Sequence, residues 1–137
     1  MKKILLVFLM IFVMLASGCA ANQEPGTDND ATGVIMIKAE DAKGRLDSEE
    51  GIILVDVRTP EEFRDGHIPG AILLPVDDIS TNAETVIPDK EATYFIYCRS
   101  GNRSAAAADQ LVEMGYQNIY DLGGINDWPY ETVTGDE

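Results

Sequence analysis

One cysteine and the polar loop that follows it are the part of this sequence best suited to chemistry. Cys98 follows an apolar run at residues 93–97, and the next six residues are Arg99, Ser100, Gly101, Asn102, Arg103 and Ser104. A cysteine reacts as its thiolate, which nearby cations, converging backbone N–H groups and a helix N-terminus stabilise. The loop offers all three, because it runs directly into a helix-forming segment. We therefore predict that Cys98 is a catalytic nucleophile in an anion-binding loop, rather than a buried structural cysteine.

Two apolar runs predict the strands that position this loop. Residues 52–57 and 93–97 are rich in β-branched and aromatic side chains, which is typical of strands buried on both faces of a parallel sheet. Further strands are expected at 34–37, 71–74 and 118–122, and helices at 39–50, 60–65, 75–83 and 104–114. The alternation predicts an α/β fold with a central, mostly parallel five-stranded sheet flanked by helices on both faces. Cys98 then lies at the carboxyl edge of the sheet, where such folds bind ligands.

Four blocks of the sequence, in this order, resemble the rhodanese-like domain. They read VDVRTPEEF (55–63), GHIPGA (66–71), YCRSGNRS (97–104) and LGGINDW (122–128). The resemblance implies a sulfurtransferase of the thiosulfate type. In that mechanism Cys98 attacks a sulfane sulfur, becomes a persulfide, and passes the sulfur to a second nucleophile such as cyanide or a thiol. The loop amides are expected to stabilise the negative charge on the persulfide.

The resemblance also implies separate roles for the two arginines of the loop. Arg99 is the candidate for holding a small anionic donor such as thiosulfate, and Arg103 corresponds to the arginine that closes and braces the loop. Four residues separate Cys98 from Arg103. The related protein phosphatases use a loop one residue longer, which is wide enough for phosphate. The shorter ring favours sulfur transfer, and a phosphate- or arsenate-binding protein is a lesser hypothesis.

Polar and aromatic residues outside the loop invite functional interpretations of their own. Asp56 and Arg58, at the end of a predicted central strand, form either a polar network that supports the loop or a surface ion pair, and the sequence does not decide between these. His67, the only histidine, is expected to be a hydrogen-bonded structural residue rather than a general base. Trp128 is expected in the core or at the rim of the site. No metal or other cofactor is expected, because one histidine and one free thiol cannot build a zinc site.

The first 18 residues have the pattern of a bacterial lipoprotein signal peptide. Two lysines precede an apolar run of 12 residues at 4–15, whereas a membrane-spanning helix needs about 20. Leu15-Ala16-Ser17-Gly18-Cys19 resembles a lipobox. We therefore expect cleavage before Cys19, lipid on Cys19, a flexible spacer over 19–32 and a rhodanese-like domain over 33–137. The expected location is the extracytoplasmic side of a cell membrane, held by the lipid.

Charge and cysteine count exclude several other classes of function. Without residues 1–18 the chain has 8 Lys and Arg against 24 Asp and Glu, a formal charge of −16. Such a surface is a poor partner for nucleic acid. If lipid occupies Cys19, Cys98 is the only thiol, so a thioredoxin-like dithiol activity is excluded. The main alternative to an enzyme is a rhodanese fold that docks a partner protein, or carries sulfur for it, without turnover of its own.

Overall fold

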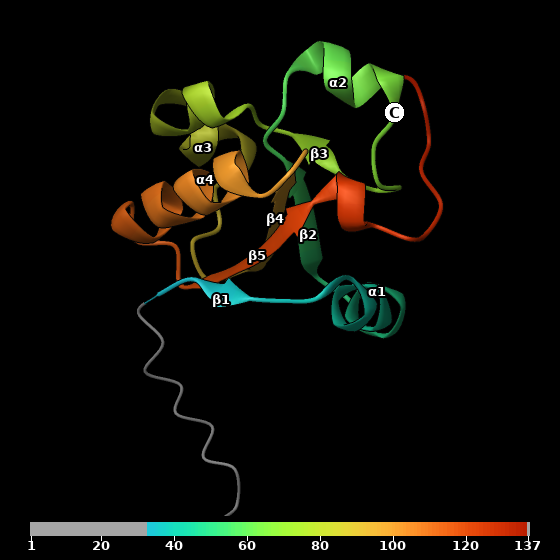
Figure 1. The fold of residues 1–137 in the computed structure, drawn as a ribbon. Coiled ribbons are helices and arrows are strands. Elements are labelled where there is room, and N and C mark those ends of the chain that lie inside the picture. Colours follow the sequence, from blue (N-terminus) through green and yellow to red (C-terminus); the bar gives the residue numbers. More distant parts are fainter. Residues whose placement is uncertain (1–32, 137) are drawn as a thin grey trace, which may run out of the picture.

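The computed structural model describes residues 33–136. The predicted signal peptide, the lipidation of Cys19 and the spacer therefore lie outside the described residues. Five strands form the central sheet (Figure 1). They are β1 (Ile35–Met36), β2 (Ile52–Asp56), β3 (Ile72–Leu73), β4 (Thr93–Cys98) and β5 (Asn118–Gly124). Their order across the sheet is β1-β5-β4-β2-β3, and all neighbouring strands run parallel, which confirms the predicted sheet.

Helices cover both faces of this sheet, as the sequence predicted. The four α-helices are α1 (Ala39–Ser48), α2 (Pro60–Asp65), α3 (Ile79–Val86) and α4 (Asn102–Glu113), and two short 3₁₀ turns are η1 (Val76–Asp78) and η2 (Ile125–Asp127). The helices α3 and α4 cover one face, and α1, α2 and η2 lie on the other (Figure 1). None of the helices described is long and apolar enough to cross a membrane.

The alternation of side chains along β4 explains why these strands are buried on both faces. Tyr94, Ile96 and Cys98 point into the core beneath α3 and α4, whereas Phe95 and Tyr97 point into the core beneath α1 and α2. Successive residues of a strand face opposite sides, so an unbroken apolar run is required here. The same alternation places the Cys98 side chain on the α4 side of the sheet.

Several helix boundaries differ from those the sequence predicted, and the helix expected at 39–50 ends at Ser48. The helix expected at 104–114 begins at Asn102, because Gly101 adopts a φ of +105° and turns the chain into the helix two residues earlier. The helix expected at 75–83 is instead the 3₁₀ turn η1 followed by α3, which runs on to Val86. Pro75 has an extended ψ of 142° and lies outside both helical elements. The loop predicted to end at Ser104 is therefore only three residues long before α4 begins.

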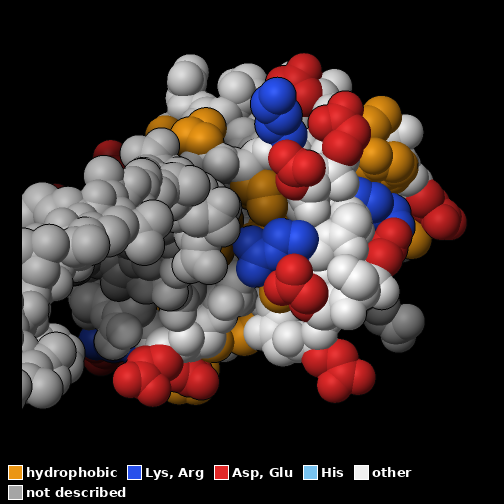
Figure 2. Space-filling view, turned by 90° about the horizontal axis from the view of Figure 1, so that it is seen from below, with side chains coloured by type: hydrophobic (Ala, Val, Ile, Leu, Met, Phe, Trp, Pro, Cys, Tyr) orange, Lys and Arg blue, Asp and Glu red, His pale blue; other side chains and the backbone are white. Residues whose placement is uncertain are grey.

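The exposed side of α1 shows how the acidic excess is distributed. Lys43 pairs with Asp47, and Arg45 pairs with Glu49, each one helical turn apart. Figure 2, a view of the molecule from below, accordingly shows blue cationic side chains beside red acidic ones rather than a field of one sign.

Candidate active site

Cys98 ends β4 and is buried, with only 1% of its surface exposed. The backbone N–H of Gly101 donates a hydrogen bond of 3.0 Å to its Sγ. Burial raises the pKa of the Cys98 thiol. Hydrogen bonds lower it, from the backbone N–H groups of Ser104, Gly101 and Ser100 and from the Ser104 hydroxyl. The net result is a pKa below the ordinary value of 9.0. The loop therefore favours the thiolate, which is the reactive form of cysteine.

The loop takes its shape from a very close approach to the end of β5. A Cβ atom built on Gly124 would lie 2.4 Å from the carbonyl oxygen of Arg99 and 2.7 Å from the Cα of Ser100. Only glycine fits at Gly124 without moving this backbone. The N–H of Asn126 donates to the same Arg99 carbonyl at 3.2 Å, which fastens the loop to η2.

A register shift between β4 and β5 places Gly123 and Gly124 beneath the loop. Ile96 pairs with Asp121, but the next residue, Tyr97, pairs with Gly123, so the register between β4 and β5 shifts by one residue. The buried Asp121 carboxylate accepts a hydrogen bond of 2.8 Å from the N–H of Gly123. Bulges of this kind commonly redirect the chain next to functional sites. Ser104 completes the contact, with its Oγ 3.2 Å from the carbonyl oxygen of Gly123.

Arg103 braces the loop by binding a glutamate on another element. Its two terminal nitrogens donate to the two carboxylate oxygens of Glu62, each at 2.8 Å. The pKa of Glu62 falls from 4.5 to about 2, chiefly because of the hydrogen bonds from Arg103, with a further lowering from the Thr59 cap. Glu62 also forms the capping box at the start of α2 with Thr59. Nothing in the local sequence indicates the ion pair, because its partners lie 41 residues apart.

Asp56 and Arg58 form a buried network, so the surface ion pair is the wrong interpretation. Arg58 Nη2 donates to Asp56 Oδ2 at 2.6 Å and to the carbonyl oxygen of Gly66 at 2.7 Å. Asp56 is 0% exposed and Arg58 5% exposed. The guanidinium also lies over the ring of Tyr97, at 5.7 Å from its centroid. The network joins the end of β2, the turn after α2 and the residue before Cys98.

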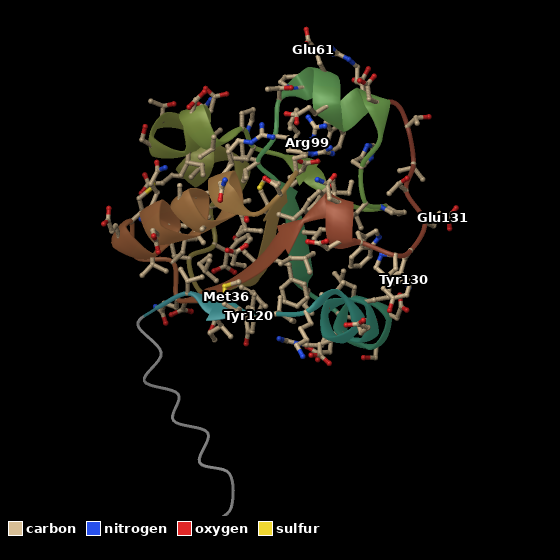
Figure 3. The ribbon with its side chains drawn as sticks, in the orientation of Figure 1. Met36, Glu61, Arg99, Tyr120, Tyr130 and Glu131 are labelled. Atoms are coloured by element: carbon tan, nitrogen blue, oxygen red, sulfur yellow. The ribbon has the colours of Figure 1, made fainter. Side chains whose placement is uncertain are left out.

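A pocket of about 430 Å³ opens between α2 and the loop. Its lining residues are Arg58, Glu62, Asp65, Gly66, Arg99, Ile125, Asn126 and Thr132. Figure 3 shows Arg99 in the space between α2 and the strand ends. The structure thus brings Arg99 and Arg58 to one pocket, while Cys98 lies buried beside it and does not line it.

The remaining candidates divide between buried and exposed positions. Ser104 is buried, whereas the side chains of Ser100 and Asn102 are exposed, so these two contribute to the loop through their backbone. His67 is buried, its Nδ1–H donates to the Phe63 carbonyl oxygen at 2.9 Å, and its ring stacks on the Phe63 ring, in agreement with a structural residue. Trp128 is buried in the core beneath α1, as expected.

The fold and this site define a class of protein, and comparison with known proteins gives the same class. The Rhodanese-like domain family matches residues 38–130. The chain therefore belongs to the rhodanese-like family and is classed with its sulfurtransferases.

Individual relatives agree with this assignment. The thiosulfate sulfurtransferase PspE of Escherichia coli (strain K12) is 37% identical over 81 residues, covering 59% of this chain and 78% of that protein. A sulfurtransferase of Allochromatium vinosum is 40% identical over 93 residues, covering 67% of this chain and 85% of that protein. The structure of a rhodanese with anions from E. coli superposes with a TM-score of 0.58 at 36% identity, covering 61% of this chain and 99% of that one.

Proposed function

We propose that this protein moves a sulfane sulfur from a small anionic donor of the thiosulfate type, through a persulfide on Cys98, to cyanide or a thiol. The observation that carries the proposal is the Cys98 sulfur itself, which the loop amides surround and whose pKa they lower. A sulfur placed in this way is a better nucleophile at neutral pH than an ordinary thiol.

The proposed reaction has two displacements. The Cys98 thiolate attacks the outer sulfur of thiosulfate, a new S–S bond forms, and the old one breaks as sulfite leaves with the electron pair. The carbon of cyanide, or the sulfur of a thiolate, then attacks the outer sulfur of the persulfide and regenerates the Cys98 thiolate. The amides of Ser100, Gly101 and Ser104 face negative charge on sulfur at every stage, which is the role of a preorganised anion site.

Two findings support an anionic donor. Arg99 lines the pocket beside the loop and has no ion-pair partner within residues 33–136. Its charge is therefore free to bind an oxyanion, whereas Arg58 and Arg103 are held by carboxylates. In addition, the E. coli relative is named a thiosulfate sulfurtransferase, and the E. coli rhodanese structure is described as containing anions.

The test is the mass of the purified chain after incubation with thiosulfate. We expect it to gain the mass of one sulfur atom, located on the peptide that contains Cys98, and to lose that mass when cyanide is added. Cys98→Ser is the control and should gain nothing. A wild-type chain that is folded but never gains sulfur from thiosulfate or other sulfane donors would refute the enzyme and leave the partner-binding module as the better description.

We also propose that the domain works outside the cytoplasm on a lipid attached to Cys19. The support is the sequence pattern of residues 1–19. When the full chain is produced in a bacterium, it should fractionate with membranes and enter the detergent phase on phase separation, and Cys19→Ser should abolish the lipid mass. A wild-type chain recovered without lipid would refute this location.

A further inference from the structure

The end of the chain adds a segment to the site that the family match does not include. Residues 131–136, here called the strap, lie beyond the matched residues 38–130. The strap runs alongside the end of α2, where Figure 1 marks the C-terminus. His67 and Val133 exchange two backbone hydrogen bonds of 2.8 Å, and the N–H of Gly135 donates to the Arg64 carbonyl at 2.9 Å. The strap is therefore held to the turn that follows α2.

Thr132 of the strap lines the same pocket as Arg99. It is fixed from both sides, because the Trp128 indole N–H donates to the carbonyl oxygen of Glu131 at 3.3 Å and Val133 forms the bridge to His67. A residue held between two such contacts cannot move aside as freely as one in a loose tail. Thr132 is therefore a fixed part of the pocket wall, although it is 33 residues from Arg99 in the sequence.

The charged and the neutral residues that line the pocket come mostly from different segments of the chain. The charged lining residues are Arg99 of the loop, Glu62 and Asp65 of α2, and Arg58, which lies between β2 and α2. The neutral lining consists of Gly66, of Ile125 and Asn126 in η2, and of Thr132 in the strap. A donor whose oxyanion end binds Arg99 must direct whatever group it carries toward the remaining walls. Thr132 of the strap is one of the walls that limit the size of that group, together with Ile125 and Asn126 of η2.

Resting on the sulfurtransferase function proposed above, we propose that Thr132 is a specificity-determining residue. Its position in the pocket wall limits the size of the group that a sulfane-sulfur donor carries. The pocket therefore favours thiosulfate over bulky organic thiosulfonates. Both kinds of donor react in the same way. With benzenethiosulfonate, the Cys98 thiolate takes the outer sulfur and benzenesulfinate leaves with the electron pair of the broken S–S bond. The strap changes which donor reaches this step and leaves the step itself unchanged.

The experiment compares kcat/KM for benzenethiosulfonate with kcat/KM for thiosulfate, with cyanide as acceptor. Thr132→Trp should lower this ratio by about tenfold, and Thr132→Gly should raise it by about threefold, since steric differences in a pocket give selectivity of this order. Thr134→Trp is the matched control, because it adds the same bulk to an exposed position of the strap outside the pocket. It should leave the ratio unchanged.

Discharge of the Cys98 persulfide by cyanide, measured separately, shows whether the loop is intact in each variant, and its rate should match that of the wild type. If Thr132→Trp does not fold, the widened pocket of Thr132→Gly still tests the proposal. Equal effects on both donors, or a ratio that stays constant in both Thr132 variants, would overturn it. Failure of the wild type to gain sulfur from any donor would instead refute the proposed function, so the two failures are distinguishable.

Discussion

The reactivity of Cys98 is decided by groups two to six residues after it in the sequence. Burial works against the thiolate, and the hydrogen bonds from Ser104, Gly101 and Ser100 work for it and prevail. Within residues 33–136 the two loop arginines have other places: Arg103 is paired with Glu62 and interacts with Cys98 only electrostatically, and Arg99 lines the pocket beside the loop. The backbone amides, rather than the arginines, are therefore the main cause of the lowered pKa.

Replacing Ser104 tests this balance. Ser104→Ala keeps the backbone N–H and removes the hydroxyl, which lowers the pKa of Cys98 and also donates to the carbonyl oxygens of Gly101 and Gly123, so the pKa of Cys98 should rise. The alkylation rate of Cys98 by iodoacetamide, followed against pH, should have its midpoint at a higher pH than in the wild type. Ser100→Ala is the control, because its exposed hydroxyl makes no such bond. An unchanged midpoint in Ser104→Ala would contradict the role given to its hydroxyl.

Replacing Gly124 tests the close contact between β5 and the loop. Gly124→Ala places a methyl group 2.4 Å from the Arg99 carbonyl oxygen, so the backbone must shift. We expect a loss of about 1–3 kcal/mol in the free energy of unfolding, measured in urea, together with slower persulfide formation.

Gly44→Ala is the matched control for Gly124→Ala. Gly44 lies within α1, and a Cβ atom there meets nothing within 4 Å. This substitution should instead stabilise the chain by up to about 1 kcal/mol, as alanine does in a helix. A Gly124→Ala variant as stable and active as the wild type would show that the loop tolerates displacement.

These residues also show what the sequence can and cannot predict. Cys98, its neighbours and the bend at Gly101 are consecutive, so their types alone indicate an anion-binding loop. The Glu62–Arg103 pair and the requirement for Gly124 depend on contacts between segments far apart in the chain. The burial of Asp56 and Arg58 depends likewise on what packs around the end of β2. The site was thus predictable where it is local and unpredictable where tertiary contacts build it.

At the scale of elements, the site is a junction between α2 and the first turn of α4. The Glu62–Arg103 pair joins the two helix starts, and the Arg58–Gly66 bond joins the end of α2 to β2. The start of α4 was predicted two residues late because the helical pattern of its apolar face begins only after Gly101 has already turned the chain. Helix and strand identities followed from periodicity, and the boundaries depended on these local turns.

The pair between α2 and α4 should show in the pH dependence of stability. The pKa of Glu62 is lowered to about 2, so the stability it contributes is complete above about pH 4.5 and is lost as the pH falls toward 2. Both side chains are partly exposed, and Glu62→Gln should therefore cost only about 0.5–1 kcal/mol at neutral pH. The difference from the wild type, measured by urea unfolding, should shrink as the pH is lowered from 4.5 to 2.

The control for this prediction is the same substitution without its partner. In an Arg103→Gln background, Glu62→Gln should lose most of its cost and most of its pH dependence, as in a double-mutant cycle. A cost that persists unchanged in that background would assign the effect to the Thr59 cap rather than to the pair between the helices.

At the scale of the whole molecule, a chain of formal charge −14 must attract an anion to one site. Under the function proposed above, the long-range field should repel thiosulfate, and Arg99 should attract it only at short range. Raising the ionic strength from about 0.02 M to about 0.3 M should therefore increase kcat/KM for thiosulfate by about two- to threefold, because salt screens the distant charges most. Alkylation by neutral iodoacetamide is the control and should not change. A decrease for thiosulfate would mean that the local field of Arg99 dominates.

The burial of Cys98 has a consequence for the chemical durability of the protein. A disulfide requires two sulfur atoms at bonding distance in a restricted geometry. With 1% of its surface exposed in each copy, the Cys98 sulfur of one folded chain cannot come within bonding distance of the Cys98 sulfur of another. Two folded copies will therefore not be joined by a Cys98–Cys98 disulfide in oxidising surroundings.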